Sequence, residues 1–150
     1  MTTPYFVDTN VLIYFRDDSE PEKQPRARRW LERLWDTRQG RTSFQVLQEY
    51  YWTATRRIRT PLSPEMARAD VRDLLLWRPL AIDATVLERA WQIEERFGFG
   101  LWDALILAAA QMSGCGYLLS EDMQHGQDVD GLQVVNPFLV DPETVSWSDL

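Results

Sequence analysis

Cysteine and histidine are nearly absent from this chain, which holds one of each, Cys115 and His125, among its 150 residues. A lone cysteine excludes an internal disulfide bond. A zinc site of the usual nitrogen and sulfur type is excluded as well, because it needs several Cys and His ligands. A nucleophile activated by histidine would have to depend on His125 alone. Metal chemistry in this chain would therefore use oxygen ligands.

Long apolar runs are also missing. The longest, Ala104–Ala110, is far shorter than the roughly 20 residues that a membrane-spanning helix needs. The N-terminus lacks the basic segment, apolar stretch and small-residue cleavage site of a secretory signal. The apolar share of 45% is nevertheless that of a globular protein. We therefore expect a single domain over residues 1–150, with a core at about 4–138, a C-terminal tail at 139–150 and a cytoplasmic location.

Lysine is scarce too, and arginine supplies all but one of the basic side chains. The net charge of −7 argues against a nucleic-acid partner, but the charge is unevenly distributed. Residues 1–80 hold 14 basic and 11 acidic side chains, whereas residues 81–150 hold 2 and 12. Arginine suits bidentate contacts with phosphate. The arginine clusters at 26–41 and 56–59 therefore predict either solvated helix faces or one basic surface on a dipolar molecule.

The spacing of apolar residues predicts strands that alternate with helices. Gly40 is expected to end the second helix, and Ser63 and Asp83 are expected to be N-caps. Because helices separate the first four strands, the sequence predicts an α/β fold with a central parallel sheet of four to five strands and helices on both faces. The expected strands are 5–8, 41–44, 80–82, 117–119 and 133–135, and the expected helices are 10–15, 26–37, 45–57, 64–77, 84–97 and 102–112.

Asp8 and Asn10 interrupt the otherwise mostly apolar run Tyr5–Phe15. An ionised carboxylate is costly to bury unless a cation or hydrogen-bond donors meet it. A strand running into a helix would place Asp8 at the carboxyl end of that strand, which is the edge where open α/β sheets bind ligands. Asp8 has a second explanation as the N-cap of the helix that follows.

Three further acids lie where the same edge of the sheet is expected. Glu49 is early in an aromatic helical stretch, Asp103 opens the most apolar helix, and Asp122 follows a strand. Strand ends and the starts of crossover helices share one edge of a parallel sheet, so these acids can converge with Asp8. Asp103 could instead interact with its helix dipole, and Asp122 could be an ordinary loop acid. Glu49, flanked by aromatic residues, is expected to need a partner.

Converging carboxylates repel one another, and some would be protonated unless a cation were present. Oxygen ligands are those that Mg²⁺ and Mn²⁺ prefer. Asn10 and Ser120 lie beside two of the acids and are expected to support them by hydrogen bonds, although each could serve a local turn or cap. The sequence therefore predicts a Mg²⁺ or Mn²⁺ site formed by Asp8, Glu49, Asp103 and Asp122.

Five segments that contain these residues resemble the motifs of PIN-domain nucleases, and in particular of VapC-type toxins from bacterial toxin–antitoxin pairs. The resemblance extends over nearly the whole chain and implies a three-layer α/β/α sandwich. It also implies an endoribonuclease that cleaves RNA with a metal held by the four acids, supported by Asn10 and Ser120. The segments, in family order, are Phe6–Tyr14, Thr42–Tyr50, Leu101–Ile106, Leu118–Gly126 and Val135–Phe138.

The resemblance further implies protein partners. Toxins of this type form homodimers and bind a small VapB-type antitoxin, a segment of which lies in the acidic groove. Some members carry a further acid shortly after the fourth, for which Asp128 and Asp130 are the nearby candidates.

Two other functions remain open from the sequence. A phosphatase of the haloacid-dehalogenase type would use Asp8 as a nucleophile, although that motif usually has a second Asp where Asn10 stands. A folded RNA- or protein-binding module would keep the acids without turnover. A covalent phosphate on Asp8 would support the first, and RNA binding without cleavage under any metal would support the second.

Overall fold

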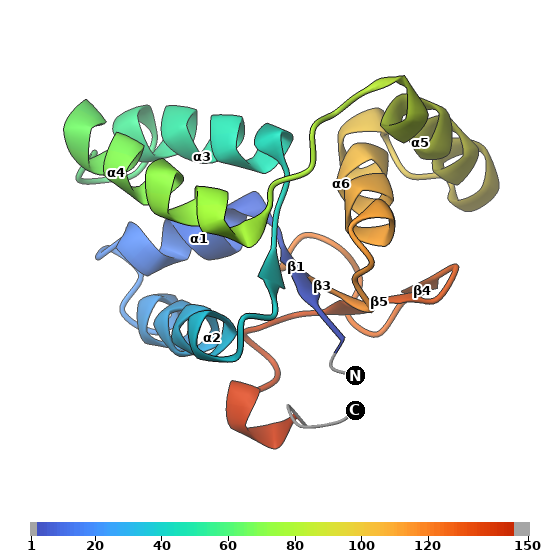
Figure 1. Cartoon of the computed structure of the whole chain (residues 1–150). Coiled ribbons are helices and arrows are strands. Elements are labelled where there is room, and N and C mark those ends of the chain that lie inside the picture. The colour runs from blue at the N-terminus through green and yellow to red at the C-terminus, as the bar shows by residue number, and fades with distance from the viewer. Residues whose placement is uncertain (1–2, 146–150) are drawn as a thin grey trace.

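The computed structural model describes residues 3–145, in which a twisted sheet lies between helices (Figure 1). The ends of the expected domain, residues 1–2 and the last part of the expected tail at 146–150, lie outside the described residues. The strands are β1 (Tyr5–Val7), β2 (Gly40–Arg41), β3 (Tyr117–Leu119), β4 (Asp128–Val129) and β5 (Leu132–Val135). The α-helices are α1 (Thr9–Arg16), α2 (Lys23–Thr37), α3 (Phe44–Arg56), α4 (Pro64–Leu74), α5 (Ala84–Phe97) and α6 (Leu101–Met112), and the short 3-10 helices are η1 (Leu75–Trp77) and η2 (Pro142–Thr144).

The sheet has the order β2-β1-β3-β5-β4. β1 pairs in parallel with β2 on one side and with β3 on the other, and β3 pairs in parallel with β5. Only β4, at the edge, runs antiparallel, as the second arm of a hairpin with β5. This confirms the predicted α/β fold with a mostly parallel sheet, and it makes β1 an interior strand whose three residues are all buried.

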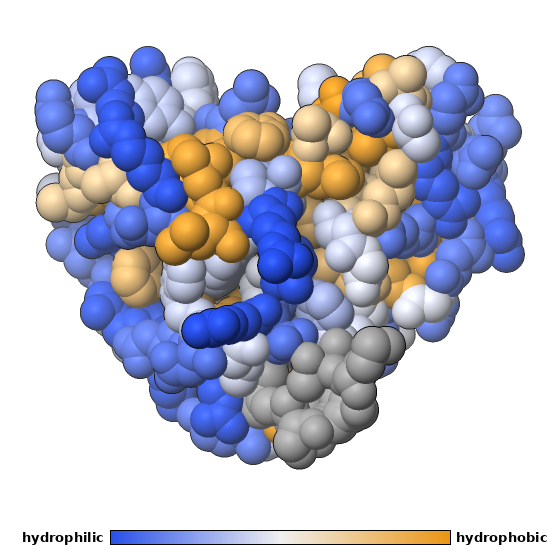
Figure 2. Space-filling model, viewed as in Figure 1, coloured by the Kyte–Doolittle hydropathy of each residue, from blue (hydrophilic) through white to orange (hydrophobic). Residues whose placement is uncertain are grey.

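Helices cover the sheet from two sides. Figure 1 shows α1 to α4 on one side of β1 and β3, and α5 and α6 on the other. The space-filling view is hollowed between these two groups of helices (Figure 2). Ala104–Ala110 of α6 is buried throughout, because its small alanines let α5 and the sheet approach closely. No helix of the described chain is long and apolar enough to span a membrane.

Trp30 of α2 fixes the C-terminal part of the described chain against the helices. Its side chain is fully buried, and its indole Nε1 donates to the carbonyl oxygens of Pro137 and Val140, each at 3.0 Å. Its ring also lies 5.7 Å from that of Tyr5 in β1, measured between ring centres. A buried indole usually finds such an acceptor, since its N–H is costly to leave unpaired.

Capping side chains set the starts of several helices as the sequence predicts. Ser63 Oγ accepts from the Met66 amide at 3.2 Å, and Pro64 occupies the first turn of α4. Asp83 Oδ1 accepts from the Val86 amide at 3.1 Å at the start of α5. These hydrogen bonds satisfy amides that have no partner within the helix.

Three sequence predictions are wrong in detail. The strand expected at 41–44 is limited to Gly40–Arg41, because Ser43 caps α3 and Phe44 is already helical. The strand expected at 80–82 is only an isolated bridge between Leu80 and Ser43, because Asp83 already caps α5 and ends the extended segment. Gly40 does not end the second helix: α2 stops at Thr37, Arg38 adopts the left-handed cap conformation, and Gly40 begins β2.

Gly40 allows the Trp77 side chain to lie close to the backbone of β2. A Cβ atom at this position would lie 2.6 Å from two carbons of the Trp77 indole, which no real Cβ contact allows. Trp77 is itself buried and its ring lies 5.0 Å from that of Trp35, so it has little freedom to move.

Replacing Gly40 by alanine should therefore lower the free energy of unfolding by about 1–3 kcal/mol, the usual cost of overpacking a core. Urea unfolding followed by circular dichroism measures this. Gly100→Ala is the control for a methyl group that meets nothing within 4 Å, and it should lose less stability, since only the N-cap preference for glycine is affected. Equal stability of the two variants would show that Trp77 adapts.

Candidate functional site

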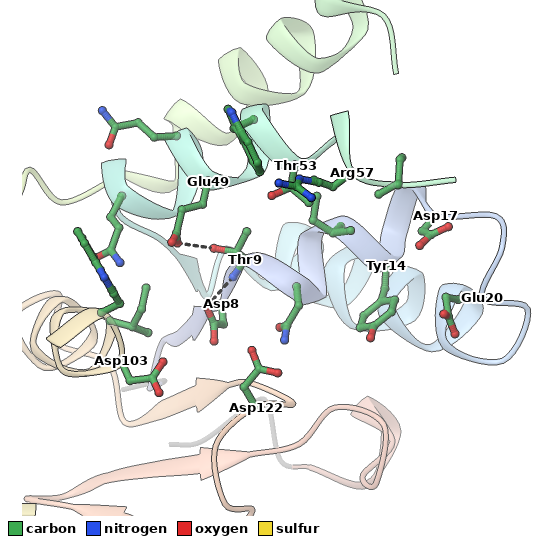
Figure 3. A pocket seen from close by; sticks show the side chains of 18 residues that line it. Asp8, Thr9, Tyr14, Asp17, Glu20, Glu49, Thr53, Arg57, Asp103 and Asp122 are labelled. Carbon is green, nitrogen blue, oxygen red and sulfur yellow. Dashed lines mark hydrogen bonds between the residues drawn. The ribbon is translucent and has the colours of Figure 1, made fainter. Parts of the chain in front are cut away.

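A cavity of about 830 Å³ opens at the carboxyl edge of the sheet, between α1, α3 and the start of α6. Figure 3 shows the side chains of Asp8, Asp103 and Asp122 converging on one space, with Glu49 reaching towards it from α3. The structure thus brings together around one cavity all four acids that the sequence singled out: Asp8, Glu49, Asp103 and Asp122.

Asp8 is the buried member of this group, with 8% of its surface exposed. β1 ends at Val7, and the Asp8 amide still donates to the Leu119 carbonyl of β3 at 3.0 Å. Its Oδ1 accepts from the Thr9 amide at 2.7 Å, and its Oδ2 accepts from the Ser120 hydroxyl at 2.9 Å. Asp8 therefore has the position that each of its two explanations expects. It caps α1, and it also faces the cavity at the end of its strand.

The surroundings of Asp8 disfavour its ionised form. Burial is the largest cause and, together with smaller contributions from the charges of Asp122 and Glu49, it raises the pKa of Asp8 to about 6. The hydrogen bonds from Ser120 and Thr9 lower the pKa but do not offset the burial. A positive charge in the cavity would reverse this balance, because it favours the ionised form.

Ser120 connects Asp8 to the loop that carries Asp122. The serine is fully buried at the end of β3, where its hydroxyl donates to Asp8 and accepts from the Asp122 amide at 3.3 Å. Ser120 was predicted to support the acids by hydrogen bonds. Its bonds to Asp8 and to the Asp122 amide are the contacts that this role needs.

Asp122 and Asp103 are exposed on the rim of the cavity. The pKa of Asp122 is raised by partial burial and by the charges of Glu121 and Asp103, against the opposing charge of Lys23. Asp103 lies in the first turn of α6, whose N-cap is Gly100 and offers no side-chain acceptor. A carboxylate there is favoured by the helix dipole, as one explanation of Asp103 expected.

Glu49 was expected to need a partner, and it has one although its side chain is exposed. Its partner is Thr9, whose hydroxyl donates to Glu49 Oε1 at 3.0 Å and so connects α1 to α3 (Figure 3). Thr9 therefore contributes to the site through its amide and its hydroxyl. The sequence reasoning missed it, although its position directly after Asp8 is a usable signal.

Two amide side chains on the cavity wall have buried atoms without partners. Asn10 Oδ1 and both polar atoms of Gln45 are shielded from solvent and form no hydrogen bond within the described chain. Such groups are costly unless a ligand or water meets them. Asn10 was predicted to be a supporting residue. Gln45 was missed, because nothing in its sequence context separates it from an ordinary helical glutamine.

A second polar cluster positions the loop after β3. Tyr14 of α1 donates its hydroxyl to Glu121 Oε1 at 2.8 Å, and Lys23 pairs with the other oxygen of Glu121. These contacts hold the residue next to Asp122 against α1 and α2. Lys23 is the only lysine of the chain, but its spacing from Glu121 in the sequence gives no hint of the pair.

The two candidates for a fifth acid lie in the β4–β5 hairpin instead. Asp130 pairs with Arg89 at 2.9 Å and with Arg96 at 3.0 Å. Asp128 Oδ1 accepts from the Gly131 amide at 2.8 Å. Neither residue lines the cavity.

The donor set suits a hard divalent cation, although the side chains do not close around one. Among residues 3–145, no three His, Cys, Asp or Glu side chains are grouped closely enough to hold a metal ion. A bound cation would offset the repulsion between these carboxylates. The oxygen ligands, the raised pKa of Asp8 and the unpartnered oxygen of Asn10 all fit Mg²⁺ or Mn²⁺.

Comparison with known families shows that the PIN domain family matches residues 5–127. No curated protein matches the sequence significantly.

Comparison with solved structures shows the same fold in a chain of a toxin–antitoxin complex and in a toxin. A toxin–antitoxin complex from Klebsiella pneumoniae contains a chain with 23% identity and a TM-score of 0.65, covering 89% of this chain and 97% of that one. VapC20 of Mycobacterium tuberculosis, a toxin that cleaves the sarcin–ricin loop, has 24% identity and a TM-score of 0.58, covering 79% of this chain and 91% of its own.

The burial of Asp8 predicts a change of stability with pH in metal-free protein. The folded chain holds the Asp8 proton more tightly than the unfolded chain does, since the pKa rises from 3.8 to about 6 on folding. Stability is therefore gained as the pH falls through about 6. Above that pH the ionised side chain costs about 3 kcal/mol.

Asp8→Asn removes that charge, so in EDTA it should raise the free energy of unfolding near pH 7.5 and lose much of this advantage near pH 4.5. Urea titrations at both pH values measure the difference. Asp83→Asn is the control, because Asp83 also caps a helix through its side chain but does not line the cavity. A destabilised Asp8→Asn variant near pH 7.5 would contradict the electrostatic reasoning.

Proposed function

Because the chain belongs to the PIN-domain family, we propose that it is a metal-dependent endoribonuclease of the VapC toxin type. One observation carries the proposal: four carboxylates from distant parts of the chain line a single cavity at the carboxyl edge of the sheet. The structural likeness to a toxin that cleaves the sarcin–ricin loop supports RNA as the substrate.

Asp8, Asp103 and Asp122 would hold Mg²⁺, for which Mn²⁺ could substitute, and Glu49 would complete the acidic site. A bound ion of this kind neutralises charge on the phosphate and lowers the pKa of its water. Asp8 is the best positioned ligand, because Thr9 and Ser120 fix its orientation with two hydrogen bonds.

Three other side chains of this site have separate roles in the proposed reaction. Glu49 is held through Oε1 by Thr9, and within the described chain its Oε2 has no partner and remains available to accept a proton from the attacking water. Asn10 offers an unpartnered carbonyl oxygen to a donor in the cavity. Ser120 sets the direction of Asp8 and holds the backbone at Asp122.

We also propose that the protein acts with a VapB-type antitoxin and forms a homodimer. The Klebsiella structure of the same fold is of a toxin–antitoxin complex, which supports the first partner. An antitoxin segment that brings a cationic side chain into the cavity would occupy the acidic site in place of the metal. The accumulated carboxylates favour such a side chain.

The proposal predicts RNA cleavage that depends on the metal and on Asp103. Purified protein with Mg²⁺ or Mn²⁺ should cut a labelled RNA that contains unpaired loops, and EDTA should abolish the cleavage. Asp103→Asn should lower the rate by about 100-fold or more, since a metal ligand provides several kcal/mol of charge stabilisation. Asp130→Asn is the matched control, because its ion pairs lie in the β4–β5 hairpin. Full activity of Asp103→Asn would refute the assignment.

The proposal also predicts an indirect role for Ser120. Ser120→Ala should lower metal affinity or activity about 10- to 100-fold, because a group that orients a metal ligand has been lost. Titration with Mn²⁺ should recover part of the activity, which a general folding defect would not allow. Ser113→Ala provides the control, since the Ser113 hydroxyl is buried without a partner. A metal titration curve identical to that of the unmodified protein would exclude this role.

A further inference from the structure

A surface between α3 and α4 combines exposed aromatic rings with arginines. It is hollowed by a cavity of about 470 Å³. Phe44 is 42% exposed and Trp52 is 45% exposed, so the core does not require these rings to be where they are. We call this the arginine–aromatic surface, and its residues are Phe44, Tyr51, Trp52, Arg56, Arg68 and Arg72.

The arginines of this surface have no acidic partners among residues 3–145. Within the described chain, Arg56, Arg68 and Arg72 form no ion pair, and neither does the neighbouring Arg57. Arg57 and Arg56 lie 4.8 and 5.9 Å from the centre of the Trp52 ring, and Arg68 lies 5.9 Å from that of Tyr51. The other basic side chains that do form ion pairs are Arg16, Lys23, Arg26, Arg29, Arg89 and Arg96.

The surface is continuous with the acidic cavity. Gln48 and Trp52 line both hollows, and Arg57 lines the acidic cavity at the end of α3. Asp17 and Glu20 also line the cavity, at the end of α1 and in the loop after it (Figure 3), and their charges repel phosphate. A nucleic-acid strand with one phosphate among the four acids would therefore extend over α3 rather than along the loop after α1.

We propose that the arginine–aromatic surface binds an unpaired RNA segment next to the cleaved bond, with a base stacked on Trp52 and phosphates on Arg56 and Arg72. This rests on the proposed function. Stacking on aromatic rings and backbone contacts with arginine are how proteins bind single strands, whereas bases inside a duplex do not present their faces. A second copy of the chain fits less well, because a two-fold interface here would place like-charged arginines against one another.

The test measures binding of a fluorescein-labelled, unpaired uridine RNA of about 12 nucleotides by anisotropy in EDTA, so that the RNA stays intact. Trp52→Ala should weaken binding about tenfold or more, and Trp52→Phe should retain most of the affinity. Trp91→Ala is the matched control, since Trp91 has the same exposure, 46%, on α5. A duplex of equal length should bind more weakly and should not distinguish the variants.

Charge is tested separately. Arg56→Gln with Arg72→Gln should reduce the slope of log Kd against log salt by about 1.4, the value for two phosphate contacts on a single strand. Arg26→Gln with Arg29→Gln removes the same charge from side chains that pair with Asp141, and should leave the slope unchanged.

Cleavage and light scattering separate the outcomes. Unmodified protein that fails to cut RNA with any metal would refute the proposed function. Normal cleavage together with unchanged RNA affinity in Trp52→Ala would overturn only the present inference. A change in the oligomeric state of Trp52→Ala with unchanged RNA affinity would also overturn it, and would assign the surface to a second copy of the chain.

Discussion

The carboxylate of Asp8 lies where the central strand β1 becomes α1, and its two hydrogen bonds determine how the site is built. The Thr9 amide bonds one oxygen and so starts α1 at this residue. The Ser120 hydroxyl bonds the other and brings in the end of β3, more than a hundred residues along the chain. The charge remains incompletely compensated, with a pKa raised to about 6. A fold that keeps such a residue loses stability at neutral pH, a loss typical of binding sites whose ligand is absent.

The remaining acids reach Asp8 because the sheet is parallel around it. β1 lies between β2 and β3, so the elements that follow these strands leave from one edge. Glu49 follows β2 on α3, and Asp122 follows β3 in a loop. Asp103 arrives from the side of α6, whose start lies at the same edge. The acids act on one another through their charges: Asp122 and Glu49 raise the pKa of Asp8, and Asp103 raises that of Asp122.

The convergence of the acids was predictable from the sequence, because it depends on where strands end and helices begin along the chain. These positions are marked by local signals such as caps. Ser63 and Asp83 are recognisable caps, and Asp8 is recognisable at a strand end. The exposure of Glu49 was not predictable from its aromatic neighbours in sequence, since adjacent positions of a helix face different directions. The β4–β5 hairpin was missed although Asp130-Gly131, with left-handed backbone at both residues, is a strong hairpin signal. The contacts of Gln45 and Lys23 depend on tertiary packing and leave no local pattern.

Net charge is a poor guide to the ligand of this protein. The chain carries −7, and part of its basic charge is paired within the fold, as at Arg29 with Asp141 and at Arg96 with Asp130. A polyanion near the cavity responds to the local electrostatic potential. On α3 and α4 that potential comes from arginines without acidic partners. Local charges dominate because salt screens interactions beyond about 8–10 Å. An acidic protein can therefore hold a cation among its carboxylates and still present a basic surface beside them.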